Sequence, residues 1–304
     1  MHILRLWRGL FRKSKTKMRV SIIIPTLCRE SLYPLVDSLL KQKVKFHFEI
    51  ILIPQYELDL SRLKDKRIKI RYEEPSKGFA FYRNKGIKLS RGSILVFIDD
   101  DELPMNNEWL RTIVAPIADK KEKVVTAGVD IPLGQGYLAD SISLLGFPGG
   151  GALGFTFHWS VNDGYTTHLC SGNLAIEKRL ILRISNFSEK MKYGSEDVDL
   201  AKRLVEAGIK IKYLKEVTVL HSARGEYLEF LKWNILRGKS AGVSLKQPIL
   251  GLIKRSFTSV RAMKKVAKEN PRYLPGMLFT ALSKHVAQIF GLIMVYLGGA
   301  YENQ

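Results

Sequence analysis

Compact apolar runs alternate with stretches of helical periodicity along the first hundred residues of the chain. The apolar runs predict buried strands at residues 20–25, 48–53, 68–72 and 93–98. Between them, apolar residues recur at the spacing of one helix face and predict helices over residues 31–43 and 78–91. Strands that alternate with helices form a parallel sheet with helices on both faces. The pattern therefore predicts an α/β fold.

The pattern changes after residue 131. Residues 132–166 mix glycines with aromatic residues, and so long a loop inside a compact domain is usually functional or mobile. Its aromatic side chains, including that of Trp159, are expected either to stack on an acceptor molecule or to pack on the surface. A helix that begins near Ser195 and a strand over residues 209–220 follow. From residue 222 the sequence is helical and basic.

Composition indicates an ordinary globular protein. The 304 residues are 46% hydrophobic and 26% charged, which excludes intrinsic disorder and collagen-like repeats. The two cysteines, Cys28 and Cys170, form no CxxC motif and are too few for a disulfide scaffold or a structural zinc site. They favour a reducing cytosol over export.

The net charge of +20 belongs mainly to the two ends of the chain. Residues 1–19 carry +7 and residues 222–304 carry +9, whereas residues 20–221 carry only +4. A nucleic-acid reader concentrates charge on its recognition element, so no nucleic-acid partner is expected. Basic ends beside apolar segments favour an anionic membrane surface as a partner.

Both ends of the chain contain apolar segments of the kind that binds a membrane surface. Residues 2–12 place apolar side chains on one helical face and arginines on the other, which indicates an interfacial helix, with a frayed basic tail as the alternative. Residues 286–301 are uncharged, but they are shorter than the roughly 20 residues of a spanning helix. We expect an interfacial or re-entrant helix there, with a marginal span or a helix packed on the domain as alternatives. The protein is expected at the cytoplasmic face of the cell membrane, as a peripheral or monotopic protein.

An acidic cluster follows the fourth predicted strand. Asp99, Asp100, Asp101 and Glu102 begin where the strand ends, and ligands of open α/β sheets bind beyond that edge. Adjacent carboxylates repel one another unless a cation lies among them. An Asp-x-Asp arrangement offers oxygen ligands to Mg²⁺ or Mn²⁺, which can in turn hold a diphosphate. The alternative is a solvated acidic turn that caps the next helix.

Three further segments favour the metal–diphosphate interpretation. Pro25 and Thr26 end the first strand at the same sheet edge, with Arg29 and Glu30 just beyond. Arg83 and Asn84 lie in the helix before the acidic strand, where a cation can meet phosphates. Glu196 and Asp197 begin a helix, whose dipole favours ionised carboxylates.

These segments resemble the ordered motifs of family 2 glycosyltransferases. The matching segments are Ser-Ile-Ile-Ile-Pro-Thr at 21–26, Arg-Asn-Lys-Gly-Ile at 83–87, Phe-Ile-Asp-Asp-Asp at 97–101 and Ser-Glu-Asp-Val-Asp-Leu at 195–200, joined by a Gly-Asn strand at 169–176. The resemblance covers about residues 18–225. It implies a GT-A fold, a Rossmann-like, mostly parallel sheet flanked by helices, here with a helical C-terminal extension. We therefore expect a basic amphipathic segment (1–17), a GT-A domain (18–225) and a helical, basic, membrane-associating region (226–304).

The resemblance also implies a role for each site residue. Asp197, supported by Glu196, is expected to be the general base. The nucleotide-sugar donor is expected to contact Pro25, Thr26, Glu30, Arg83, Asn84, Asp99 and Asp100. Mn²⁺ or Mg²⁺ is expected at Asp101, Asp99 and His221, and the acceptor at Gly172 and Asn173, with Trp159 from the aromatic loop. The family has an Asp after the second strand that contacts the nucleobase, and this chain has Gln55-Tyr56-Glu57 there. Glu57, Asp59 or the backbone alone is therefore expected to hold the nucleobase.

The expected reaction is a metal-dependent inverting transfer of a sugar from a nucleotide-diphosphate sugar to an acceptor hydroxyl. A lipid-linked sugar or a nascent glycan is the expected acceptor, because a membrane-resident acceptor gives the basic, amphipathic ends a purpose. Two alternatives stay open. One is a haloacid-type phosphatase, which also places Asp-x-Asp at a strand end; the other is a non-catalytic membrane-surface or nucleic-acid binder on a GT-A-like domain.

Overall fold

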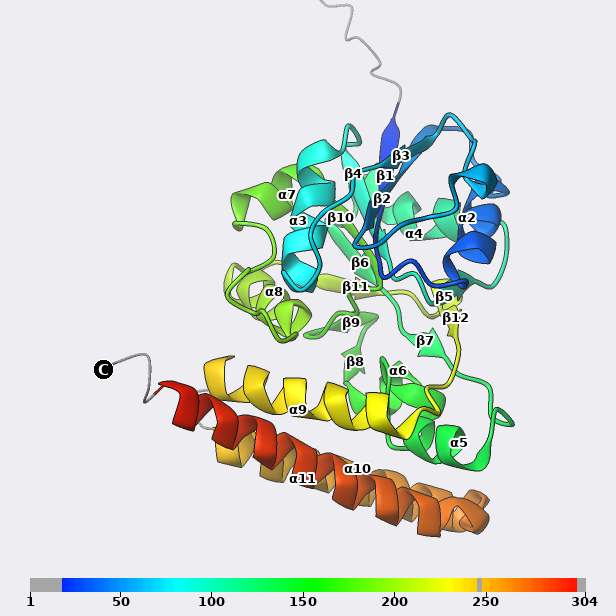
Figure 1. Ribbon diagram of the computed structural model, residues 1–304. Helices are drawn as coiled ribbons and strands as arrows, with labels where there is room; N and C mark the ends of the chain where they lie inside the picture. The colour runs from blue at the N-terminus through cyan, green and yellow to red at the C-terminus, as the bar shows by residue number, and fades with distance from the viewer. Residues whose placement is uncertain (1–17, 245–247, 300–304) are drawn as a thin grey trace, which may run out of the picture.

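The computed structural model describes residues 18–244 and 248–299 (Figure 1). Within these residues, nine strands form one sheet in the order β3-β2-β1-β4-β10-β6-β11-β9-β8. Their bounds are β1 Arg19–Thr26, β2 His47–Pro54, β3 Ile68–Ile70, β4 Ile94–Ile98, β6 Val124–Thr126, β8 Val161–Asn162, β9 Tyr165–Thr166, β10 Asn173–Glu177 and β11 Ile211–Tyr213. Strands β5 Glu102–Pro104, β12 Val219–His221 and β7 Val129–Asp130 form a smaller sheet.

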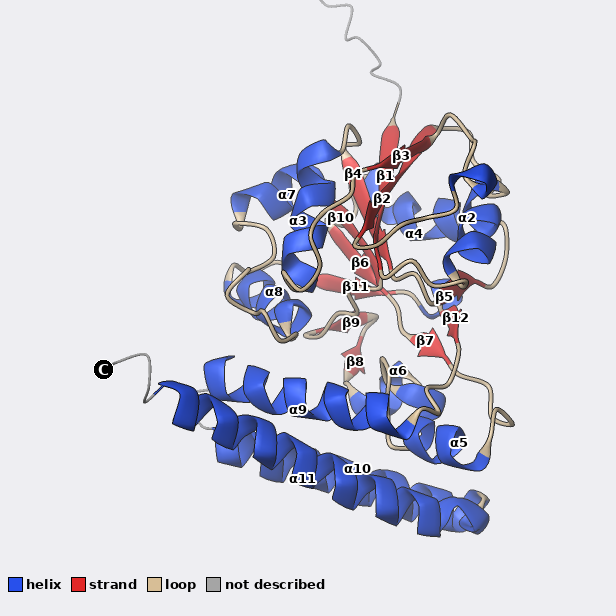
Figure 2. Ribbon diagram, in the orientation of Figure 1, coloured by secondary structure: helices blue, strands red, loops and turns tan. Residues whose placement is uncertain are grey.

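Helices cover both faces of the large sheet, as the sequence pattern predicts (Figure 2). Helices α2 (Leu32–Leu40) and α4 (Trp109–Ala118) pack on one face, and α3 (Phe79–Leu89), α7 (Lys178–Arg183) and α8 (Glu196–Glu206) pack on the other. The central strands are buried between them because β1 and β4 are continuous apolar runs. Gly86 lets α3 approach β1, since a Cβ there would lie 2.2 Å from Ile23 Cγ2.

The sheet is mixed rather than purely parallel. Strands β1, β2, β3 and β4 are parallel neighbours, but β10 runs antiparallel to both β4 and β6. The predicted strand over residues 209–220 is two strands, because a 3₁₀ turn at Lys215–Val217 interrupts it. The second of these, β12, leaves the large sheet and pairs with β5, which brings His221 opposite Glu102.

The remaining helices form what we call the helical layer, which lies below the carboxyl ends of β1 and β4 in Figure 1. It consists of α5 (Tyr137–Leu144), α6 (Phe155–His158), α9 (Tyr227–Ser244), α10 (Pro248–Glu269) and α11 (Leu274–Gly299). Residues 132–166 are therefore not one long loop. Their apolar side chains pack on the C-terminal helices, as Leu144 and Leu145 do against Ala262 and Met277.

Helices α9 and α11 pack with their backbones almost in contact. A Cβ at Gly238 would lie 2.0 Å from the carbonyl oxygen of Gln288, and one at Gly291 would lie 2.0 Å from that of Ile235. Beside this contact, Gln288 Nε2 donates a hydrogen bond of 2.8 Å to Asn234 Oδ1. Small residues and buried amides at a helix crossing are common in membrane proteins.

The uncharged C-terminal stretch is part of one continuous helix, α11. The segment Pro271–Gly298 is long and apolar enough to cross a membrane by length and composition. An 18-residue window within it has a mean hydropathy of 1.5, and 39% of that window is buried inside the molecule. The inner face of α11 packs on the layer, as the packed-helix alternative predicted. Its outer face exposes large apolar side chains. The predicted N-terminal interfacial helix at residues 1–17 lies outside the described residues.

Candidate active site

A cavity of about 580 Å³ lies between the carboxyl ends of the strands and the helical layer. The predicted site residues that line it are Pro25, Thr26, Arg83, Asp99, Asp100, Asp101, Trp159, Gly172, Glu196, Asp197 and His221. Segments spread over almost two hundred positions therefore meet at one place.

Asp100 joins the first and fourth strands at the edge of the cavity. Its Oδ2 accepts hydrogen bonds from Thr26 Oγ1 at 2.7 Å and from the amide of Leu27 at 2.9 Å. Burial, reinforced by the charge of Asp101, raises the pKa of its carboxyl. Asp100 thus fixes the turn that follows β1, where the resemblance places the nucleoside.

Asp101 lies at the centre of a cationic ring. Its Oδ2 accepts from Arg224 at 2.6 Å and from Arg29 at 3.1 Å, and its Oδ1 lies 3.4 Å from His221 Nε2. Although burial opposes ionisation, His221 and the two arginines hold the pKa of Asp101 well below its usual range. The sequence analysis did not identify Arg224, whose one sequence signal is its place three residues after His221.

Arg83 links the acidic cluster to the predicted base. Its buried guanidinium donates from NH2 to Asp99 Oδ1 at 2.7 Å and from NH1 to Glu196 Oε1 at 2.5 Å. Arg83 therefore holds two carboxylates of the site, one on each side of the cavity, instead of projecting freely toward a diphosphate.

The carboxylate pair opens helix α8. Glu196 is buried and Asp197 is half-buried, facing the cavity. Burial raises the pKa of both carboxyls; that of Glu196 reaches about 7, with Arg83 opposing the rise and Asp197 adding to it. A carboxylate with a raised pKa is a stronger base, which suits proton removal from a hydroxyl.

Three predicted site residues do not line the cavity. Glu30 is exposed and pairs with Arg62 at 3.0 Å. Asn84 donates to the carbonyl of Phe187 and accepts from its amide, which ties α3 to the segment before α8. Asn173 is buried and donates to the carbonyls of Gly128 and Val217. The side chains of Asn84 and Asn173 therefore hold backbone segments together.

The residues expected to contact the nucleobase also differ in whether they line the cavity. Gln55 lines the cavity, whereas Glu57 and Asp59 do not. Asp59 instead accepts hydrogen bonds from the amide and hydroxyl of Ser61, at 3.0 and 2.6 Å.

The helical layer supplies a wall of the cavity that the sequence analysis did not predict. Its lining residues are His158, Trp233, Arg237, Thr258, Ser259, Lys284 and Gln288. Trp233 stacks on Phe79 of α3, and the Arg224 guanidinium carbon lies 5.3 Å from the centre of the Trp233 ring. Helical periodicity alone does not indicate which polar residues of a C-terminal helix will face a site.

The residues beside Asp101 fit a divalent cation in part. His221 Nδ1 lies 2.6 Å from the carbonyl oxygen of Ser222, a contact that orients Nε2 toward Asp101. An imidazole nitrogen with a carboxylate oxygen suits Mn²⁺ or Mg²⁺ when phosphate oxygens supply further ligands. Within the described residues, no group of three His, Cys, Asp or Glu side chains could hold a metal ion by itself. A cation beside Asp101 would therefore need phosphate oxygens of a bound ligand to complete its coordination.

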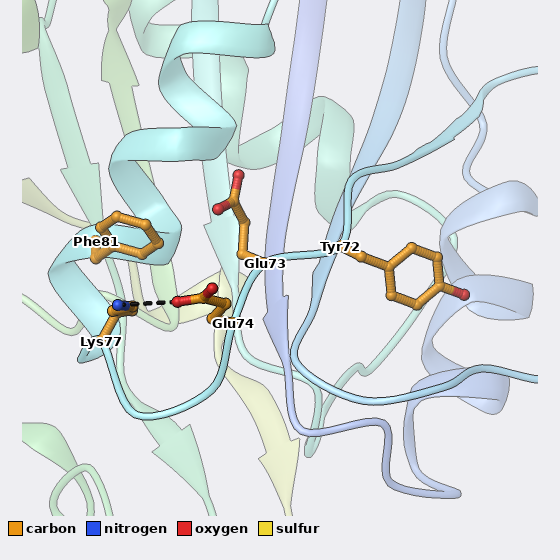
Figure 3. A pocket seen from close by; sticks show the side chains of 5 residues that line it. All are labelled: Tyr72, Glu73, Glu74, Lys77 and Phe81. Atoms are coloured by element: carbon orange, nitrogen blue, oxygen red, sulfur yellow. Dashed lines mark ion pairs between the residues drawn. The ribbon is translucent and has the colours of Figure 1, made fainter.

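A second hollow, of about 520 Å³, lies where the segment after β3 passes α3 (Figure 3). Tyr72, Glu73, Glu74, Lys77 and Phe81 line it, and Lys77 pairs with Glu74 at 3.0 Å. It contains none of the predicted site residues, so the cavity at the strand ends is the candidate active site.

The sequence profile described as Glycosyl transferase family 2 matches residues 21–182, which contain the strand ends and the acidic cluster. The chain belongs to glycosyl transferase family 2. The match stops before α8 and before the C-terminal helices of the helical layer.

Among solved structures, the fold is similar to the mannosyltransferase PcManGT from Pyrobaculum calidifontis, determined in complex with GDP-Man and Mn²⁺. The TM-score is 0.60 at 15% identity, over 96% of this chain and 94% of that one. The similarity confirms the predicted GT-A-like fold.

Curated relatives match parts of the chain. The O-antigen biosynthesis protein RfbC of Myxococcus xanthus is 24% identical over 67% of this chain and 17% of its own length. The UDP-Glc:alpha-D-GlcNAc-diphosphoundecaprenol beta-1,3-glucosyltransferase WfaP of Escherichia coli is 34% identical over 32% of this chain and 38% of its own. The chain thus spans less than half the length of these relatives.

Proposed function

We propose that this family 2 glycosyltransferase moves a sugar from a nucleotide-diphosphate donor to an acceptor hydroxyl with inversion, using Asp197 as the general base. The observation that supports this most directly is one cavity lined by both the acidic cluster and the Glu196–Asp197 pair, with Arg83 bonded to each side. An inverting transfer needs a base and a diphosphate site facing one reaction centre, because attack and departure occur on opposite sides of the anomeric carbon.

Each group has a step to perform. Asp197 takes the proton of the acceptor hydroxyl as its oxygen bonds to the anomeric carbon. Arg29 and Arg224, which donate hydrogen bonds to Asp101, lie where they can also stabilise the negative charge of the leaving nucleoside diphosphate. A divalent cation held by Asp101 and His221 would supply further charge neutralisation for that diphosphate. Glu196, held by Arg83, lies beside Asp197 at the start of α8, where burial raises the pKa of both carboxyls.

The acceptor in this proposal is a lipid-linked sugar presented at the cytoplasmic membrane surface. The name of the Escherichia coli relative specifies a diphosphoundecaprenol-linked acceptor, and a Haloferax volcanii relative is named a glucosyl-dolichyl phosphate glucuronosyltransferase. The outer face of α11 exposes apolar side chains on the same layer that walls the cavity. A helix that lies in the membrane interface with such a face would bring the cavity to a lipid-linked substrate.

Donor binding tests the proposal. Thermal unfolding is measured with UDP-, GDP-, dTDP- and CDP-sugars, with Mn²⁺, with Mg²⁺ and with neither, on the wild type and on Asp101→Asn. A donor at about 100 times its Kd stabilises the fold by about 2.7 kcal/mol. We expect one nucleotide class to stabilise the wild type in a metal-dependent way and to lose most of this effect in the variant. If no nucleotide stabilises the protein, a non-catalytic binder becomes the better interpretation.

A further inference from the structure

One end of the active-site cavity has a composition of its own. His158 of α6, Thr258 and Ser259 of α10, and Lys284 and Gln288 of α11 line it. These residues offer an ammonium, hydroxyls, an amide and an imidazole. Among the described lining residues, every carboxylate comes instead from the segment 99–102 or from the start of α8. This end is therefore suited to an anion.

Lys284 is anchored in place. Its Nζ donates a hydrogen bond of 2.6 Å to Ser259 Oγ, which joins α11 to α10. Its charge is also felt by the neighbouring imidazole: burial, then Lys284 and then Arg261 lower the pKa of His158 to about 4. Burial is the main reason that His158 stays neutral, and Lys284 adds a positive charge to this end of the cavity.

His158 lies at this end of the cavity and packs against its backbone. Its Nε2 is buried and has no hydrogen-bond partner among the described residues. Gly146 leaves space for the ring, since a Cβ there would lie 2.6 Å from Nε2. The ring therefore packs against Gly146 and shapes this end of the cavity without bonding to the anion itself.

We propose that this end of the cavity is the subsite for the phosphate or diphosphate that joins the acceptor sugar to its lipid, with Lys284 as its principal cation. The inference rests on the proposed function and specifies the acceptor's chemistry. The cations near the donor site, Arg29 and Arg224, are bonded to Asp101, whereas Lys284 lies on the helix whose outer face is apolar. A headgroup at Lys284 therefore lies on the side of the molecule from which its lipid can reach a membrane.

Calorimetry on the full chain in EDTA tests the subsite apart from donor and metal. The probes are farnesyl diphosphate, farnesol and inorganic pyrophosphate. We expect farnesyl diphosphate to bind, farnesol not to bind and pyrophosphate to bind more weakly. Lys284→Gln should weaken farnesyl diphosphate by about tenfold or more, because it removes a charge-assisted hydrogen bond. The matched control Lys268→Gln, an exposed lysine of α10 outside the cavity, should leave the affinity unchanged.

Two variants of Thr258 that differ only in charge control for misfolding of a single variant. Thr258→Glu and Thr258→Gln have the same shape and differ in one negative charge, so the Glu variant should bind farnesyl diphosphate at least about tenfold more weakly than the Gln variant. Equal affinities in this pair, or an unchanged affinity in a folded Lys284→Gln, would overturn the subsite. Pyrophosphate that binds as tightly as farnesyl diphosphate would assign the site to free phosphate and overturn the lipid assignment.

The two proposals fail in different ways. The subsite alone would be refuted if nucleotide sugars stabilise the wild type through Asp101 while farnesyl diphosphate binds equally well to the Lys284→Gln variant. Lys284-dependent binding without any response to nucleotide sugars would refute the transferase instead.

Discussion

Arg83 NH1 lies 2.5 Å from Glu196 Oε1, in a buried ion pair between residues 113 positions apart in the sequence. The same guanidinium holds Asp99, so the start of α8 is fixed relative to the end of β4. The distance between base and leaving group in an inverting transfer is set by these two elements. In the proposed reaction, Arg83 is therefore a positioning residue.

The raised carboxyl pKa values predict an unusual pH profile. A base works only when ionised, so kcat/KM falls as the pH drops through the pKa of the carboxylate pair. Because burial raises the pKa of Asp197, the proposed base, we expect the acidic limb at a higher pH than the usual range of a carboxyl. Glu196→Gln removes a neighbouring negative charge and should move the limb to lower pH. An acidic limb near pH 4 in the wild type would contradict this.

Removing the base should separate catalysis from donor binding. Asp197→Asn keeps the shape of the side chain but cannot accept the proton, so kcat should fall by about 10²–10⁴-fold. Donor stabilisation in thermal unfolding should be retained. Val205→Ala, a substitution of an exposed residue of the same helix outside the cavity, serves as the control and should keep its activity. Near-normal turnover in Asp197→Asn would transfer the role of base to another residue.

Gly172 should resist even a methyl group. A Cβ there would lie 2.5 Å from Glu102 Oε1 and 2.8 Å from Asp99 Oδ2, so Gly172→Ala must displace carboxylates of the acidic cluster. A displacement of about 1 Å in a reaction centre can reduce the rate about 100-fold, and we expect a loss of that order in kcat/KM. Far-ultraviolet circular dichroism should show an unchanged fold. An active Gly172→Ala would indicate that the cluster tolerates movement.

The contact between α9 and α11 predicts a difference between two glycines. Gly238→Ala would place its Cβ 2.0 Å from the carbonyl oxygen of Gln288 and should destabilise the protein by about 1–3 kcal/mol. Gly298→Ala meets no described atom within 4 Å and should be neutral or slightly stabilising, because alanine favours helix. Thermal unfolding of both variants in the same detergent makes the comparison. Equal melting temperatures would show that the two helices separate easily.

The outer face of α11 should carry membrane binding. Leu282, Phe290 and Leu297 are 68%, 53% and 62% exposed, and replacing all three with Gln should weaken binding to phosphatidylglycerol-containing vesicles by at least about tenfold. Leu60, Leu89 and Leu182 are exposed apolar residues away from the helical layer, and their replacement with Gln provides the control. Sedimentation with vesicles measures both. Equal binding of the two triple variants would refute a role for this face.

Sequence patterns predicted the half of the site that depends on strand ends. Asp100 and Thr26 are 74 positions apart, yet their meeting follows from adjacent parallel strands that end at one edge. Asn84 and Asn173 occupy motif positions, but their amides bond to backbone carbonyls, which no local pattern reveals. Lys284 faces the cavity only because α11 packs against α10, so its place depends on tertiary structure.

The cavity walls have a consequence for how such a protein can diverge. The acidic cluster lies within the segment that matches the family profile, whereas the lining residues of α9, α10 and α11 lie beyond it. If these helices bind the acceptor, as proposed above, mutations in them change which acceptor is bound while the donor site stays under separate selection. Exchanging those helices between relatives is therefore a direct route to transferases with the same donor and a new acceptor.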